Sequence, residues 1–312
     1  MKRLVVSSSP HIRSSAKTNR IMLDVIIALL PATVAGIIIF GARALAVISV
    51  TVSMAVFSEF IFNLAAKKNQ TVDDLSAIVT GLLLALNLRV DAPLWQCGLG
   101  AIFAIVVVKC LFGGLGCNFA NPAITARVFL VISFTSTIGG GAVPRLSSAP
   151  ELVSGATPLE LIGKTTDLPS ILDMFLGLRS GAIGETCILA LLIGFVYLVV
   201  RGVIKVDIPL IFIGTVFVLS LIAESSFTIA LYHVLSGGLV LGAVFMATDY
   251  VTTPITRSGK MIFAFGCGLI TFLIRRFGSY PEGVSYAILV MNIISPYIEK
   301  LTAPRALGGK KV

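Results

Sequence analysis

The run IMLDVIIALLPATVAGIIIF at residues 21–40 decides the class of this protein. Its one charged residue is Asp24, and a helix of about 20 mostly apolar residues crosses the roughly 30 Å hydrocarbon core of a bilayer. The whole chain has the same character, since 56% of its 312 residues are hydrophobic, 12% are charged and the mean hydropathy is +1.00. A soluble domain has about a quarter of its residues charged. The sequence therefore predicts an integral membrane protein whose surface mostly contacts lipid.

Further apolar segments follow the first, so the sequence predicts an all-α polytopic membrane protein with about ten transmembrane helices. The segments that are clear by length and hydropathy are Ile21–Phe40, Leu45–Leu64, Leu94–Phe112, Ala182–Val200, Ile208–Ala223, Phe227–Met246 and Met261–Ile274. The less regular segments are Leu75–Leu88, Asn118–Phe134 and Tyr280–Tyr297. Several of them begin or end with Gly, Pro or Asn. Such residues are tolerated at membrane depth where the backbone lines a protein cavity or meets neighbouring helices.

Residues 135–181 form one long connection that divides these segments five and five. We expect a single integral membrane domain over residues 1–312, with helix groups at 21–134 and 182–300. Residues 1–20 and 301–312 are then short terminal segments. The equal division is compatible with two five-helix repeats, an arrangement that many membrane folds use.

The distribution of Lys and Arg predicts the orientation in the membrane, because cytoplasmic loops carry an excess of both. With the N-terminus inside, the inner segments hold sixteen bases: Lys2, Arg3, Arg13, Lys17, Arg20, Lys67, Lys68, Lys109, Arg201, Lys205, Arg257, Lys260, Lys300, Arg305, Lys310 and Lys311. The outer segments hold seven: Arg43, Arg89, Arg145, Lys164, Arg179, Arg275 and Arg276. We therefore expect the chain to lie in a cytoplasmic membrane with both termini in the cytoplasm and the 135–181 loop outside.

The net charge of +9 could indicate a nucleic-acid partner, but the bases lie in short loops between apolar runs and form no basic face. We expect membrane lipid as a partner and no nucleic acid. The five cysteines show neither CxxC pairs nor regular metal-ligand spacing, so no metal is expected on this chain alone. A site shared with a partner subunit stays open.

The 135–181 loop contains Glu151-Leu-Val-Ser154-Gly155-Ala156-Thr157-Pro158. The residues alone indicate a turn, because Gly155 gives the backbone freedom and Pro158 pushes Thr157 toward an extended conformation. An ordinary exposed loop is the simpler interpretation of this pattern.

Ser154-Gly155-Ala156-Thr157 resembles the acceptor motif in which a flavin transferase joins FMN through its phosphate to the final threonine. Further blocks resemble, in order, the D subunits of Rnf complexes and the homologous B subunit of the sodium-translocating NADH:quinone reductase. These blocks are Ser8-Ser-Pro-His-Ile12, Asn121-Pro-Ala123 with Ala126-Arg-Val-Phe129, Met246-Ala-Thr-Asp249 with Val251-Thr252 and Pro254, and Tyr280-Pro-Glu-Gly-Val284. The family usually has Asp where Glu151 stands, and commonly has Pro where Tyr250 stands.

This resemblance implies a flavin-carrying subunit of an ion-translocating ferredoxin:NAD⁺ oxidoreductase, inactive alone and assembled with other Rnf subunits. FMN would be linked covalently to Thr157 after the action of a flavin transferase, and riboflavin is a candidate second, non-covalent flavin. Electrons would pass through the FMN, coupled to Na⁺ or H⁺ movement. Thr157 would be an attachment point, so no catalytic residue is assigned.

Polar residues within or beside the apolar runs are candidates for an internal site, because ionisable groups there usually face the bundle interior. Asn121, Thr248 and Asp249 are predicted to line a cavity for flavin or an ion, with structural pairing between the two halves as the alternative. Arg127 lies inside a span, where it could neutralise a flavin or pair with an acid, and the structural pair is the simpler interpretation. Asp24 and Glu59, near span ends, are expected to be hydrated.

A transporter or channel without a redox role is the second hypothesis, since about ten spans with discontinuous helices suit it equally well. A subunit that mainly scaffolds its partners is a third, and is compatible with the first. Thr157 separates the first two hypotheses, because a carrier has no need for an acceptor threonine in an outer loop.

Overall fold

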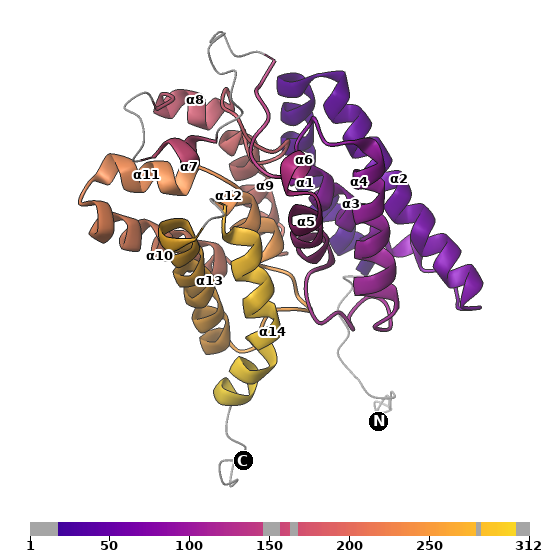
Figure 1. The fold of residues 1–312 in the computed structure, drawn as a ribbon. Helices are drawn as coiled ribbons and strands as arrows, with labels where there is room; N and C mark the ends of the chain where they lie inside the picture. The colour runs from indigo at the N-terminus through magenta and orange to yellow at the C-terminus, as the bar shows by residue number, and fades with distance from the viewer. Residues whose placement is uncertain (1–17, 146–156, 163–167, 279–281, 304–312) are drawn as a thin grey trace, which may run out of the picture.

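The computed structural model describes residues 18–145, 157–162, 168–278 and 282–303, and within these ranges the chain is helical (Figure 1). The first half contains α1 (Thr18–Phe40), α2 (Ala42–Ala65), η1 (Val72–Asp74), α3 (Ser76–Leu86), α4 (Leu94–Ile102), the π-helix η2 (Phe103–Cys110) and α5 (Pro122–Ser133). The long connection carries α6 (Thr135–Ile138), α7 (Pro158–Leu161) and α8 (Ile171–Leu176). The second half contains α9 (Ile188–Val200), α10 (Asp207–Glu224), α11 (Phe227–Leu235), α12 (Leu239–Leu241), the π-helix η3 (Gly242–Met246), α13 (Arg257–Phe277) and α14 (Val284–Thr302).

Close helix packing in the first half depends on small residues. A Cβ atom on Gly81 of α3 would lie 2.9 Å from the Cα of Val52 and 3.0 Å from the Cβ of Ala55, both in α2. Membrane helices pack mainly through van der Waals contact, so a small residue at such a crossing lets two backbones approach. Helix α2 also packs against α4, and α1 packs against α3.

The second half repeats this arrangement. Helix α10 packs against both α11 and α13, as α2 packs against both α3 and α4. Gly268 of α13 faces α10, where a Cβ atom would lie 3.0 Å from the carbonyl oxygen of Phe212. The halves meet through α1 against α9 and through α5 against α14. This parallel is compatible with the two five-helix repeats expected from sequence.

The apolar segments predicted from sequence all contain helix, and the prediction of an all-α polytopic membrane protein is confirmed. Within the described residues, α1, α2, α10 and α13 are long and apolar enough to cross a membrane. The pair formed by α11 and Leu239–Met246 passes the same test together but is bent by 62°. The shorter apolar helices are α3, α4 with η2, α5 and α9.

Several predicted boundaries are wrong, and each error lies at a polar or flexible residue. The segment expected at Ala182–Val200 is helical only from Ile188, because residues 177–187 form a loop. Asn118–Phe134 becomes helical only at Pro122, and Tyr280–Tyr297 is helical from Val284 to Thr302. Phe227–Met246 is broken at residues 236–238, where Gly237 has a φ of +64°.

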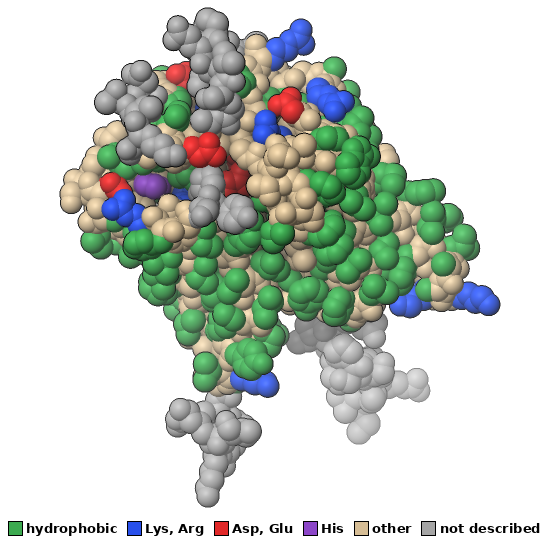
Figure 2. Space-filling model, in the orientation of Figure 1, with side chains coloured by type: hydrophobic (Ala, Val, Ile, Leu, Met, Phe, Trp, Pro, Cys, Tyr) green, Lys and Arg blue, Asp and Glu red, His purple; other side chains and the backbone are tan. Residues whose placement is uncertain are grey.

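Helices α6, α7 and α8 gather at one end of the bundle, called the loop end, and α14 runs from this end to the opposite one (Figure 1). On the face drawn in Figure 2, hydrophobic side chains form a broad band between charged side chains near the two ends. Large hydrophobic side chains are exposed on the long helices, among them Ile38, Leu64 and Ile222. Such a band fits contact with lipid and not with water.

Candidate functional site

Thr157 precedes α7 at the loop end, and its carbonyl oxygen accepts hydrogen bonds from the backbone N–H groups of Glu160 and Leu161 at 2.9 and 3.3 Å. Its side chain is 2% exposed, and its Oγ1 has no hydrogen-bond partner in the part of the chain that the structure describes. The rest of the predicted acceptor motif, Ser154, Gly155 and Ala156, lies outside the described residues. The hydroxyl is therefore buried without a hydrogen bond to any described residue.

The loop at residues 177–187 lies next to Thr157. A Cβ atom on Gly141 would be 2.9 Å from Thr157 Cγ2, 2.9 Å from the Gly181 nitrogen and 3.1 Å from the Ser180 carbonyl carbon. Gly141 thus lies against both the threonine and this loop, with no room for a side chain between them. Ala142 and Gly181 also exchange backbone hydrogen bonds of 3.1 and 3.2 Å, which fix the two segments together.

Arg179 and Glu185 are the buried charges of that loop, with exposed fractions of 1% and 2%. Arg179 donates through Nη2 to the Glu185 carbonyl oxygen at 2.7 Å, while its Nη1 has no partner among the described residues. Glu185 accepts from the Ala182 N–H at 3.0 Å through Oε1, while its Oε2 is likewise unpaired. Burial lowers the pKa of Arg179 to about 10 and raises the pKa of Glu185, because both charged forms lose hydration.

Arg127 and Arg275 complete this group of charges. Arg127 of α5 forms a short ion pair with Glu282, which precedes α14. Arg275 of α13 donates to the carbonyl oxygens of Glu282 and Ser236, both at 3.2 Å, and so braces the break after α11. Glu185 interacts electrostatically with Glu282, Arg127 and Arg179. We call Arg127, Arg179, Glu185, Arg275 and Glu282 the loop-end cluster.

The predicted internal site is divided between two places. Arg127 lies in the loop-end cluster, in a structural pair with an acid, and lines a cavity of about 230 Å³ together with Glu160 and Tyr286. Asn121, Thr248 and Asp249 instead line a separate cavity of about 360 Å³. Arg127 lies apart from these three residues, because α5 carries it away from the helix start at Asn121 toward the loop end.

Asn121 joins the two halves at the larger cavity. Its side-chain oxygen caps α5 by accepting from the N–H groups of Ala123 and Ile124 at 3.0 and 3.4 Å. Its Nδ2 donates to the carbonyl oxygen of Met246 at 3.3 Å, at the end of η3. A helix start and a helix end therefore meet at this cavity, as the discontinuous segments predicted.

Asp249 follows η3, and burial raises the pKa of its carboxyl group although Val251 N–H and Thr252 Oγ1 donate to it at 3.4 and 3.1 Å. Thr248 donates to the Val244 carbonyl oxygen at 2.6 Å, so its hydroxyl is satisfied within its own helix. Tyr250 also lines the cavity and donates a hydrogen bond to the Val203 carbonyl oxygen through its hydroxyl.

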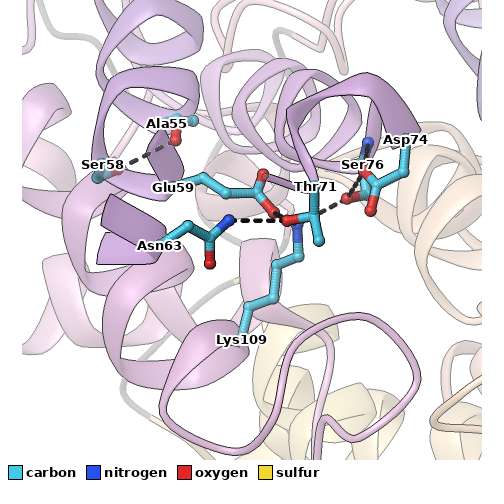
Figure 3. Close-up of polar contacts among 8 residues, drawn as sticks. All are labelled: Ala55, Ser58, Glu59, Asn63, Thr71, Asp74, Ser76 and Lys109. Carbon is cyan, nitrogen blue, oxygen red and sulfur yellow. Dashed lines mark hydrogen bonds and ion pairs between the residues drawn. The ribbon is translucent and has the colours of Figure 1, made fainter. Parts of the chain in front are cut away.

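A buried ionic network beside this cavity was missed from sequence. Lys109 Nζ lies 2.6 Å from Glu59 Oε1 and 2.6 Å from Ser76 Oγ, and it lines the cavity wall (Figure 3). Thr71 donates to Glu59 Oε1 at 2.7 Å, and Asn63 donates to Thr71 at 2.9 Å. Ser76 also donates to Asp74. We call Glu59, Asn63, Thr71, Asp74, Ser76 and Lys109 the Lys109 network.

The expectation that Glu59 and Asp24 are hydrated is wrong. Glu59 is 1% exposed and paired with Lys109, fifty residues away in the chain. Asp24 is 7% exposed and accepts from Tyr197 at 2.9 Å and from Arg201 at 3.2 Å. Only the fold brings these partners together, and no local spacing in the sequence indicates them.

The part of the chain that the structure describes holds no group of three or more His, Cys, Asp or Glu side chains that could bind a metal. All five cysteines are free, with Cys117 exposed and Cys187 partly exposed.

A family model described as the NQR2, RnfD, RnfE family matches residues 5–308. The chain belongs to this family. It is 47% identical over 313 residues to the D subunit of the Na⁺-translocating ferredoxin:NAD⁺ oxidoreductase complex of Acetobacterium woodii, an alignment that covers 99% of this chain and 96% of the relative. It is 40% identical over 322 residues to the D subunit of the proton-translocating complex of Clostridium ljungdahlii, with 98% and 96% covered.

A third relative in this NQR2, RnfD, RnfE family is the D subunit of the ion-translocating oxidoreductase complex of Stutzerimonas stutzeri. It is 38% identical over 332 residues, covering 95% of this chain and 93% of the relative. The resemblance inferred from the motif blocks is thus confirmed. The first two relatives are named for different ions, so family membership does not decide between Na⁺ and H⁺.

Proposed function

We propose that this chain is the flavin-carrying membrane subunit of an ion-translocating ferredoxin:NAD⁺ oxidoreductase, with FMN linked covalently to Thr157. Its relatives are the D subunits of such complexes, which supports the complex and the other subunits as partners. The observation that carries the flavin part of the proposal is the Thr157 hydroxyl, which is buried, has no partner among the described residues and lies near the loop that carries the buried Arg179. A loop that only connects helices has no reason to bury an unpaired hydroxyl, because doing so costs about 1–3 kcal/mol.

Thr157 would hold the flavin through a bond from its Oγ1 to the phosphorus of the flavin phosphate. The hydroxyl loses its proton as this bond forms, and a nucleoside monophosphate leaves the same phosphorus of a flavin dinucleotide donor. The bound flavin supplies one- and two-electron chemistry, while the protein supplies placement and electrostatics. The tether keeps the flavin at a high local concentration without tight non-covalent binding.

Attachment requires that Thr157 leave its position in the structure, because a transferase cannot reach a side chain that is 2% exposed. Helix α7, which directly follows Thr157, has only four residues and can dock late in folding. We infer that the transferase acts on Thr157 before α7 packs against α11, and that the modified residue then docks.

The larger cavity is the site that we propose for a non-covalent flavin such as riboflavin. Its volume of about 360 Å³ falls within the 300–1,000 Å³ typical of small-molecule sites, and its lining combines apolar side chains with a few polar groups. Asn118 contributes a buried side-chain oxygen that has no partner among the described residues. Asn121, Thr248, Asp249 and Lys109 would provide the other polar contacts.

We further propose that the loop end faces the outside of a bacterial or archaeal cytoplasmic membrane and that both termini face the cytoplasm. The excess of Lys and Arg in the opposite set of segments supports this orientation. Electrons would then cross between a flavin near the inner face and the Thr157-linked flavin near the outer face, coupled to movement of Na⁺ or H⁺.

The test is production of the full chain with a flavin transferase, followed by flavin fluorescence of the denatured band. We expect a fluorescent band for wild type and for Thr157→Ser, which keeps a hydroxyl, and none for Thr157→Ala. Thr137→Ala, which removes another loop-end threonine, is the matched control and should remain fluorescent. A dark wild-type band would contradict the flavin proposal and favour the non-redox transporter.

A further inference from the structure

Several buried polar atoms at the loop end have no hydrogen-bond partner among the described residues. Besides Thr157 Oγ1, these atoms include Arg179 Nη1, Glu185 Oε2, Thr186 Oγ1 and Ser236 Oγ. Each of these residues is at least nine-tenths buried. Native proteins leave few such atoms, and each one usually indicates a missing partner. One of them, Arg179 Nη1, is a charged donor.

The fold brings this donor and the threonine to the same place. A Cβ atom on Gly141 would meet both Thr157 and the Ser180–Gly181 backbone, which directly follows Arg179. Gly237 lies next to both Arg275 and Leu159 of α7: a Cβ atom on it would be 3.2 Å from Arg275 Nη2 and 3.8 Å from Leu159 Cδ2. The segment that begins at Thr157 therefore packs close to the loop that carries Arg179 and, through Leu159, close to Arg275.

The charge of the surroundings indicates the sign of the missing partner. The loop-end cluster has three arginines and two glutamates, so it carries one net positive charge when all five are ionised. A phosphate esterified both to the ribityl chain of a flavin and to Thr157 is a phosphodiester with one negative charge. Such a group would bring the total to zero, whereas a cation would increase the imbalance in a region from which water is largely excluded.

We propose that the loop-end cluster is the binding site of the flavin phosphodiester on Thr157, with Arg179 as its main counter-ion. This inference rests on the proposed function. Arginine suits the role because its planar fork binds two phosphate oxygens at once and stays charged when buried. Thr186 and Ser236 are further buried residues at the loop end whose hydroxyls have no partner among the described residues. The cluster therefore holds the phosphate in place.

The experiment is a thermodynamic cycle on the full chain in detergent, produced with and without a flavin transferase, in wild type and Arg179→Gln. Mass analysis establishes the adduct, and the melting temperature Tm is measured for all forms. Attachment should raise Tm by at least a few degrees in wild type, because it gives a buried charged donor its partner. In Arg179→Gln we expect the adduct to form and most of this rise to be lost.

The matched control is Arg276→Gln, since Arg276 is also a loop-end arginine but is 50% exposed and bonded to Glu224 at 2.7 Å. It should keep the full rise. Arg179→Lys retains the charge without the fork and should keep part of the rise, which provides the comparison if Arg179→Gln does not fold. If the adduct raises Tm equally in wild type and in either Arg179 variant, this inference is overturned, whereas the proposed function still stands.

Two other outcomes separate the proposals. Absence of the adduct from wild type would overturn the proposed function and this inference together. The second outcome concerns vesicles with anionic head groups. If they stabilise the unmodified chain, if Arg179→Gln abolishes this stabilisation and if the adduct does not reduce it, then Arg179 binds lipid. That result would contradict the phosphodiester site.

Discussion

At one side of the larger cavity Lys109 meets Glu59 and Ser76, each at 2.6 Å, while at the loop end Arg179 and Arg275 donate mainly to backbone carbonyl oxygens. Both regions bury charge inside a membrane protein, where charge is costly. The Lys109 network pairs its ammonium with a carboxylate and a hydroxyl. At the loop-end cluster, Arg179 Nη1 has no partner among the described residues, and neither do the nearby hydroxyls of Thr157, Thr186 and Ser236. The first region pairs its ammonium with a buried carboxylate, of which Glu59 Oε2 alone has no partner among the described residues, whereas the second has a charged donor that an added anion would satisfy.

The largest expected effect is in the Lys109 network. Lys109→Met leaves Glu59 buried without its counter-charge, and breaking one side of a buried pair costs about 3–5 kcal/mol. We expect a corresponding loss in the free energy of unfolding, measured by thermal denaturation in detergent. The double variant Lys109→Met with Glu59→Gln should regain most of the loss, and failure to do so would show that the pair is not the source of the cost.

A smaller effect is expected for Arg127→Gln, which breaks the ion pair between α5 and the residue before α14. Glu282 has 22% of its side chain exposed, so water can partly replace the arginine and the cost should be about 2 kcal/mol. The same denaturation measurement checks it. A loss as large as that of Lys109→Met would mean that the two regions do not differ in how they satisfy charge.

The smallest effect is a dependence of stability on pH through Glu185. Burial raises its pKa above the ordinary value of 4.5, so the folded state favours the protonated form. The contribution of Glu185 to stability is then full below pH 4.5 and is lost as pH rises through the raised pKa, by at most about 1.4 kcal/mol per pH unit. Glu185→Gln should remove this slope from melting curves of the unmodified chain. An unchanged slope would assign it to another group.

The sequence predicted the fold to the extent that hydropathy and helix-breaking residues determine it. The long spans α1, α2, α10 and α13 follow directly from apolar runs. The break at Gly237 and the late start of α9 at Ile188 do not, because Phe227–Met246 and Ala182–Val200 are apolar throughout most of their length. Their backbones are interrupted by tertiary packing around Arg275 and Glu185.

The candidate sites show the same limit. Asn121, Thr248 and Asp249 were predicted together because polar residues at helix ends are unusual in a membrane. Lys109 with Glu59 was not, since their pairing joins positions fifty residues apart. Arg179 was counted only as an outer base, and nothing in its local sequence indicates that it is 1% exposed in a loop that packs near Thr157.

The most direct test of the central claim is the mass of the peptide that contains Thr157, obtained from the chain isolated from membranes of its native host. The account predicts one FMN on this peptide, bound through its phosphate to Thr157, and none on any other peptide of the chain. A peptide of unmodified mass, from membranes in which the complex is assembled, would contradict it.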